Sequence, residues 1–369
     1  MNKTLIAMAV AGLMAAPMAA QADATIYGKI HASIDAGDTG ADDFAGPPEL
    51  LGSSTYWQSN SSRLGFKGSE DLGGGLKAIW QFESNISIGS GKTSWGGRNS
   101  YVGLQGGWGT LLGGKHDTPM KTTGRKFDLF GDYVGDSRNL ISGNIIDPAT
   151  GEQATGFDLR PDNAVMYKTP VFGGGWDISA LYTLEDGSKD SEILSANVNW
   201  KTGNWYSSLA YETHGKAYTL AGETGEESNI RLGVYWTPGA WKLTALYQTI
   251  SELGGVADLD STVMGLGAAY KMGKNVIKGQ YYVTSNDCTG CSNVDASLIA
   301  VAWDYNFSKR TTGYIAYATT SNDENIYYGV DGGGHGGEIN EAAYAIGDAG
   351  GVVEGKDPSA ISLGVIHKF

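Results

Sequence analysis

The sequence predicts an all-β fold, a sixteen-stranded antiparallel β-barrel that spans a membrane. Three observations lead to it: sixteen segments alternate between apolar and polar residues, short and long connections alternate between the later segments, and aromatic residues gather beside the short connections. The 56 glycines and 20 tyrosines of the 369-residue chain suit a protein rich in turns and strands.

Residues 1–22 have the pattern of a secretory signal peptide. Lys3 supplies the positive charge, the stretch from Leu5 to Met14 is apolar, and Ala20-Gln21-Ala22 forms the expected cleavage site. The apolar stretch is too short to cross a bilayer as a helix, which disfavours an N-terminal anchor. The sequence therefore predicts an exported protein with a transmembrane barrel at residues 23–369.

The first half of the chain begins with a clear alternation at residues 26–35. Ile26, Ile30 and Ile34 point to one face of that strand, while Lys29 and His31 point to the other. A polar loop is expected at residues 38–57. The next strands are expected at residues 63–69, 76–84, 98–105 and 110–115.

A long charged connection, from residue 116 to about residue 158, then interrupts the alternation. It carries bases and acids in turn: Lys121, Arg125, Lys126, Asp128, Asp132, Asp136 and Arg138. Charges of both signs require polar surroundings inside an all-β chain. We expect this third long connection to fold into the barrel and set the width of its lumen.

Alternation returns in the second half and is more regular there. Leu194, Ala196 and Val198, for example, alternate with Ser195 and Asn197. Eleven strands are expected, at residues 160–168, 177–184, 194–200, 205–214, 230–237, 242–248, 261–270, 275–284, 295–307, 311–320 and 360–369. With the first five they make an even number, as bacterial outer-membrane barrels have.

The connections in this half are alternately short and long. Short ones occupy residues 201–204, 237–240, 271–274 and 308–310, and long ones occupy residues 215–228, 251–260, 285–294 and about 321–358. This places the short turns together at one end of the sheet. Trp200 and Trp205 flank one turn, and Trp236 and Trp241 flank the next, as in the aromatic belt of a membrane interface.

A soluble β-sandwich is the competing fold, with its apolar face inward and the tryptophans capping a core. The strand number, the turn asymmetry and the signal peptide favour the barrel, because a sheet can span hydrocarbon only when it closes. The last strand ends at Phe369 without a tail, so we expect it to pair with the first strand.

Charge and motifs exclude several classes of function. The formal net charge of −14 argues against a nucleic-acid partner. The stretch Gly89–Thr93 lacks the earlier glycine of a phosphate-binding loop, because Ile86 stands there, and we expect neither an enzyme nor a cofactor. Cys288 and Cys291 have no neighbouring Cys or His pair for zinc, so we expect a disulfide that holds a loop tip.

The long connection at residues 321–358 is rich in acids and glycines. Its carboxylates are Asp323, Glu324, Asp331, Glu338, Glu341, Asp348, Glu354 and Asp357. Carboxylate oxygens are preferred ligands of hard cations, so weak binding of divalent cations shared with lipopolysaccharide is one interpretation. A solvated surface loop is the other.

Several motifs, in this order, resemble one family. They are Tyr27-Gly28-Lys29, the run from Ser62 to Ala78 (SRLGFKGSEDLGGGLKA), Tyr101-Val102-Gly103-Leu104, the run from Phe127 to Asp132 (FDLFGD), the run from Asp162 to Tyr167 (DNAVMY) and the terminal Phe369. The whole mature chain resembles the trimeric general-diffusion porins of Gram-negative bacteria, especially the branch found in Neisseria and Comamonas.

The resemblance implies a homotrimer in the cell outer membrane. It implies a water-filled channel for passive diffusion of ions and small hydrophilic solutes, with the third loop folded inward as a constriction. It also implies a last strand, ending in Phe369, that the barrel-assembly machinery recognises. A substrate-specific channel of the same fold, and a secreted β-rich binding protein or adhesin, are the alternatives.

The resemblance also assigns residues to the constriction. Basic residues on inward-facing strand positions would oppose acidic residues on the third loop; these are Lys29, Arg63, Lys77, Lys115 and Arg160 on the wall, and Asp128 and Asp132 on the loop. Lys29 and Lys115 stand where the family often has arginine. Arg125 and Lys126, on the loop itself, leave the sign of any ion selectivity open.

Overall fold

A computed structural model describes the chain in residues 23–40, 53–146, 153–154, 156–184, 191–220, 223, 225–331, 335 and 355–369. The expected signal peptide at residues 1–22 lies outside the described residues, as does most of the expected outer loop at residues 321–358.

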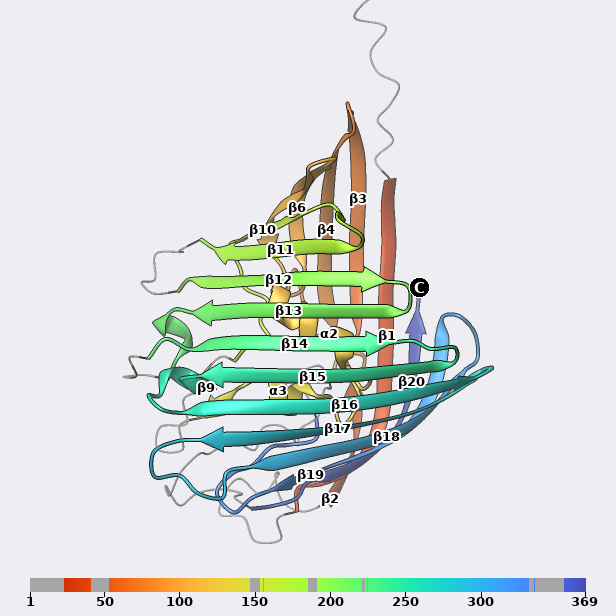
Figure 1. Cartoon of the computed structure of the whole chain (residues 1–369). Helices are drawn as coiled ribbons and strands as arrows, with labels where there is room; N and C mark the ends of the chain where they lie inside the picture. Colours follow the sequence, from red (N-terminus) through yellow and green to blue (C-terminus); the bar gives the residue numbers. More distant parts are fainter. Residues whose placement is uncertain are drawn as a thin grey trace, which may run out of the picture.

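The described residues form a closed antiparallel barrel of sixteen strands (Figure 1). The wall consists of β1 (Asp23–Asp38), β3 (Arg63–Gly73), β4 (Leu76–Ile86), β6 (Ser100–Gly106), β7 (Gly109–Lys115), β10 (Ala164–Lys168), β11 (Trp176–Thr183), β12 (Ile193–Thr202), β13 (Trp205–His214), β14 (Ser228–Trp236), β15 (Trp241–Ser251), β16 (Asp260–Met272), β17 (Asn275–Asp287), β18 (Ala296–Asn306), β19 (Thr311–Asn322) and β20 (Ser359–Lys368). The sixteen-stranded barrel predicted from the sequence is confirmed.

Four further short strands accompany the wall. β2 (Ser53–Ser59) continues the line of β3, since both pair with β1, and β5 (Thr93–Ser94) adds to the end of β4. β8 (Ile145–Ile146) and β9 (Gln153–Ala154) form a separate two-stranded sheet. The expectation of a polar loop at residues 38–57 was therefore wrong at its end, where backbone pairing with β1 extends the strand.

The barrel closes where the two ends of the chain meet. β1 pairs with β20 from Lys29↔Lys368 to Asp38↔Ser359, and with β3 on its other side. Phe369 continues the seam: its carbonyl accepts a hydrogen bond from the Gly28 amide at 3.1 Å. Closure leaves no unpaired edge, as a sheet in hydrocarbon requires.

The two faces of the wall differ as the alternation predicted. In β14, Ile230 and Leu232 are 49% and 48% exposed, whereas Arg231 between them is fully buried. The apolar side chains point outward, where hydrocarbon would solvate them, and the polar ones point inward. Beside the short turns, tryptophans are exposed on the outer face, and Trp205 stacks on Trp236 with ring centroids 5.1 Å apart.

The charged third connection contains helices that the strand pattern did not predict. These are α2 (Pro119–Phe127) and α3 (Arg138–Ile141). Thr118 caps α2 by accepting a hydrogen bond from the Lys121 amide at 3.1 Å, and Pro119 suits the first turn because its missing amide needs no partner there. No helix in the described part of the chain has the length and hydropathy to cross a membrane.

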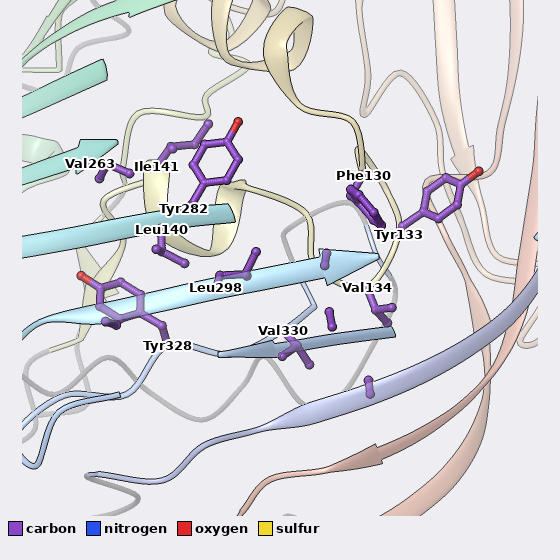
Figure 2. Close-up of a cluster of buried hydrophobic side chains, with 14 of the residues drawn as sticks. Phe130, Tyr133, Val134, Leu140, Ile141, Val263, Tyr282, Leu298, Tyr328 and Val330 are labelled. Carbon is purple, nitrogen blue, oxygen red and sulfur yellow. The ribbon is translucent and has the colours of Figure 1, made fainter. Parts of the chain in front are cut away.

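The third connection packs against the polar face of the wall. α2 contacts strands β12 to β15, and two wall glycines make room for it: a Cβ at Gly233 would overlap the Phe127 ring, and one at Gly267 would meet Leu129. Beyond α2, Figure 2 shows Phe130, Val134 and Leu140 gathered with side chains of the wall.

Part of the last long connection joins the same core. Val330 and Tyr328 lie beside the third connection in Figure 2, and the Val330 carbonyl accepts a hydrogen bond from the Gly135 amide at 2.6 Å. Both side chains are buried. The two connections are therefore held to each other as well as to the wall.

Candidate functional site

Asp132 is the centre of the charged cluster. Its carboxylate lies 2.6 Å from Lys29 Nζ of β1, 3.3 Å from Arg125 Nη2 and 3.0 Å from Arg138 Nη2. Burial opposes ionisation of Asp132, but these three cations hold the pKa of its carboxyl well below the usual value. Asp132 is therefore an anion at neutral pH, and one wall lysine is fixed to the third connection through it.

Lys29 and Asp132 thus pair a base of the wall with an acid of the third connection. Asp132 itself adopts a positive φ of 68°. Aspartate tolerates this left-handed conformation better than most residues because its short polar side chain can bond locally. The turn directs the carboxylate toward the three cations.

A chain of ion pairs extends from Asp132 along the third connection. Arg138 also binds Asp136, with Nε 2.9 Å from Oδ1, and Asp158, with Nη1 3.3 Å from Oδ2. Lys121 lies 3.3 Å from the same Asp158 carboxylate. The basic residues of the connection therefore neutralise much of its own acidity.

A second group lies on the neighbouring wall strands. Arg63 of β3 pairs in register with Lys29 of β1, and its Nε lies 3.9 Å from Oε2 of Glu83. Arg98, just before β6, binds the same glutamate through Oε1 at 2.5 Å. Two arginines thus share one carboxylate, and Nη1 of Arg63 has no hydrogen-bond partner.

Arg160 is placed differently from the expectation. The sixth strand was expected to start at residue 160, but β10 starts at Ala164, so Arg160 belongs to the connection before it. Its Nη2 lies 2.7 Å from Oδ1 of Asp117, at the other end of the third connection. The assignment to a strand was wrong because this ion pair and the Pro161 ring hold the chain out of the sheet.

Lys115 and Lys77 do not join the cluster. Lys115 ends β7 and binds Asp162, which is largely exposed, at 2.7 Å. Lys77 is exposed at the start of β4, next to the Gly73–Gly75 turn, and makes no ion pair within the described residues. Lys77 shares one set of alternate positions along β4 with Gln81 and Glu83, but the sequence does not show how far along the barrel it lies.

Lys126 and Asp128 also remain apart from Asp132. Lys126 ends α2 with its Nζ 5.8 Å from the Tyr206 ring centroid. Asp128 accepts a hydrogen bond from Gln280 Nε2 at 2.9 Å instead of meeting a wall base. Burial, together with the nearby Asp136, raises the pKa of Asp128 to about 7, so its charge is only partial at neutral pH.

Arg231 anchors the third connection although sequence reasoning gave it no role. Fully buried on β14, it donates to the Met120 carbonyl at 3.0 Å and to the Ile141 carbonyl at 2.8 Å. Gln248 of β15 donates to the same Ile141 carbonyl at 3.0 Å. Ile141 is the last residue of α3, and the last carbonyls of a helix lack partners within the helix, so Arg231 and Gln248 satisfy one of them.

The other residues that sequence reasoning missed share a feature. All are charged residues on the polar face of a strand, just before a strand or in the third connection: Glu83, Arg98, Asp117, Asp136, Arg138 and Asp158. Their position in the alternation was the available signal. It could not rank them, because ranking depends on which distant segments meet.

The remaining predicted residues lie away from the cluster. Cys288 and Cys291 are joined by a disulfide in the connection between β17 and β18. Phe369 lies at the seam, against Gly28. Of the acids expected to bind divalent cations at residues 321–358, several lie outside the described residues, and no group of three or more metal-ligating side chains is found within them.

The arrangement can act on charged solutes. Taken as ionised, Lys29, Arg63, Arg98, Arg125 and Arg138 face four carboxylates, which are Glu83, Asp132, Asp136 and Asp158. The cluster thus carries excess positive charge, although the whole chain is acidic. Opposed charges fixed on a wall and a loop create a field that acts on ions and dipoles beside them.

Comparisons with known proteins agree with the architecture. A family model described as Gram-negative porin matches residues 7–325. The major outer membrane protein P.IB of Neisseria meningitidis serogroup B is 31% identical over 332 residues, covering 86% of this chain and 92% of the relative. Its counterpart from Neisseria gonorrhoeae is 27% identical over 339 residues, with the same coverage.

Solved structures are similar in fold. An anion-selective porin from Comamonas acidovorans matches with a TM-score of 0.73 and 23% identity, covering 95% of this chain and all of the other. The in-vitro folded OmpT of Vibrio cholerae, in its trimer form, matches with a TM-score of 0.67 and 15% identity, covering 94% and 99%.

Proposed function

The chain belongs to the family of Gram-negative porins, and on this premise we propose that it is a general-diffusion channel for ions and small hydrophilic solutes. It is an outer-membrane porin, a barrel through which solutes diffuse. The finer proposal is that the third connection, about residues 116–158, folds into the lumen and narrows the water-filled path.

The single observation that carries this proposal is the binding of the third connection to the polar face of the wall. Lys29 of β1 holds Asp132, and Arg231 of β14 holds the carbonyls of Met120 and Ile141. These contacts come from well-separated wall strands. A segment anchored in this way spans the lumen instead of lying at its rim.

The charge balance of the cluster supports a modest preference for anions. Five cations around Asp132 and Glu83 exceed the four carboxylates that they contact. Small anions would be concentrated there, and small cations would still pass through the rest of the aqueous section.

We further propose a homotrimer, assembled with help from the machinery that reads the strand ending in Phe369, with outer loops that meet lipopolysaccharide. The trimeric form of the OmpT relative supports the assembly. Catalysis and resident cofactors have no part in this proposal.

Liposome swelling tests the proposal. Vesicles containing the purified protein should swell in arabinose and glucose and respond progressively less to larger sugars, because a fixed constriction sieves by size. A substrate-specific channel would instead admit one sugar and exclude others of equal size. Vesicles that admit no sugar would contradict the proposed channel.

A further inference from the structure

A second group of cations lies on the wall strands β13 to β17, toward the end with short connections. We define the lysine–tyrosine shelf as Lys126 of α2, Tyr206 of β13, Tyr235 of β14, Lys242 of β15 and Lys278 of β17. None of these side chains contacts Asp132 within hydrogen-bond distance. The shelf is therefore separate in its contacts from the cluster around Asp132.

Two stacked rings form the apolar surface of the shelf. Tyr206 and Tyr235 pair in register, with ring centroids 5.1 Å apart and ring planes 17° from parallel. Phe127 supports both rings from α2, at 6.0 Å and 6.2 Å, in the space that Gly233 leaves. Both tyrosines are partly exposed, so the rings have surface available to a solute.

Ammonium groups border these rings. Lys126 Nζ lies 5.8 Å from the Tyr206 centroid, and Lys242 Nζ lies 5.3 Å from the Tyr235 centroid. Lys242 also donates to the Lys126 carbonyl at 3.3 Å, which holds it at the end of α2. Such cation–π contacts orient the ammonium groups without neutralising them.

Two of the three shelf lysines lack a described carboxylate at ion-pair distance. Neither Lys126 nor Lys242 forms an ion pair with any described residue, while Lys278 is paired with Asp304 at 3.1 Å. Asp128 of the third connection acts electrostatically on Lys242 and Lys278, but it forms no ion pair with any shelf lysine in the described residues, and its carboxylate accepts a hydrogen bond from Gln280 Nε2. Two cations beside exposed aromatic surface therefore have no described carboxylate at ion-pair distance.

We propose that the lysine–tyrosine shelf is a binding site for aromatic carboxylates that pass through the channel. The inference rests on the proposed function and adds a solute class to it. The carboxylate binds the ammonium groups of Lys126 and Lys242, and the ring of the solute packs on the exposed surface of Tyr206 and Tyr235.

This arrangement distinguishes solutes by two features at once. A cyclohexane carboxylate keeps the charge but loses aromatic contact, and benzyl alcohol keeps the ring but loses the charge. Each should bind less well than benzoate, because each uses only one half of the shelf. Weak binding suits a channel, since a solute must also leave.

Planar bilayers supply the test, with the purified full-length mature protein in KCl. Benzoate added to both sides should reduce the KCl conductance in a saturable way, with an apparent affinity at least threefold greater than that of cyclohexanecarboxylate. Benzyl alcohol should have no saturable effect.

The double variant Lys126→Gln, Lys242→Gln should weaken benzoate binding about tenfold, in line with the loss of a charge-assisted contact. Tyr206→Leu should remove the preference for benzoate over cyclohexanecarboxylate.

Lys309→Gln is the matched control, because Lys309 is exposed in the turn between β18 and β19, at the same end of the barrel. It should bind benzoate as the unmodified protein does. Equal block by benzoate and cyclohexanecarboxylate, or block unchanged in the double lysine variant, would overturn the inference. Normal KCl steps without any benzoate block would also overturn it while leaving the proposed channel intact, whereas absence of KCl steps would contradict the channel itself.

Discussion

Asp132 shows at the scale of one residue how the barrel and its third connection depend on each other. Its carboxylate contacts Lys29 of the wall and two arginines of the connection, and its own side chain is 3% exposed. Removing one partner from a buried ion pair costs much more than a surface pair would, because the remaining charges lose compensation without regaining water.

The variant Asp132→Asn should therefore change both selectivity and stability. Three cations would lose their shared anion. The reversal potential in a KCl gradient should therefore shift toward the equilibrium potential of chloride. Unfolding by urea in lipid vesicles should show a loss of roughly 3 kcal/mol. Asp162→Asn is the control, since that carboxylate is 70% exposed in its pair with Lys115. Equal changes of reversal potential and of unfolding free energy in the two variants would contradict the special role of Asp132.

Asp128 predicts a dependence on pH. Its pKa is raised to about 7, so the carboxyl is neutral well below pH 7 and negative well above it. As pH rises from 6 to 8 the channel gains negative charge, and the anion preference should decrease. Reversal potentials across this range would show the step, and Asp128→Asn should abolish it. If the reversal potential of Asp128→Asn still changed between pH 6 and pH 8, a group other than Asp128 would be responsible for the change.

At the scale of elements, the wall and the third connection differ in how far the sequence could predict them. Alternation located all sixteen wall strands, because period-two patterning follows directly from one face meeting lipid and the other meeting water. β2 was not predicted because Ser53–Ser59 is polar except at Tyr56 and Trp57, which are adjacent and so give no alternation of apolar and polar residues. The sequence analysis did not predict α2, although Thr118-Pro119 is a typical start of a helix. The helix packs against wall strands that are distant in the sequence, and the local pattern does not show those contacts.

The charged residues of the site were predictable as a set and not as partners. Lys29 and Asp132 meet as expected, but Asp128 binds Gln280 and Arg160 binds Asp117. Which charges meet depends on the folded path of the third connection. That path is fixed by contacts more than a hundred positions apart along the chain, such as Arg231 with Met120.

The fit between α2 and the wall gives an element-scale prediction. Gly233→Ala should displace the Phe127 ring and shift α2, because the added Cβ would overlap that ring. Single-channel conductance should change by tens of per cent, on the order expected for an altered constriction. Gly279→Ala is the control, since its Cβ would meet its neighbours at ordinary contact distances. Unchanged conductance in Gly233→Ala would show that the position of α2 does not limit the current.

For the molecule as a whole, closure of the barrel depends on the last strand. Phe369→Ala should reduce the amount of folded protein in the outer membrane severalfold, while refolding of the purified chain in detergent should proceed. The expected difference arises because β20 keeps its pairing with β1 and β19, whereas the terminal aromatic residue is lost for recognition.

Phe307→Ala provides the comparison, as Phe307 is an exposed aromatic residue (59% exposed) beside a short turn. It should leave outer-membrane levels close to normal. If both variants fell to the same extent, the loss would reflect the aromatic belt in general. Impaired refolding of Phe369→Ala in detergent would instead assign Phe369 a structural role at the seam.

The central claim for the whole molecule is that it holds an open aqueous path, narrowed by the third connection, without a saturable site for small ions. Single-channel conductance across a wide range of KCl concentrations tests this most directly. The account predicts discrete steps whose conductance rises nearly in proportion to the salt. Conductance that saturates at moderate salt, or the absence of steps in correctly folded protein, would contradict it.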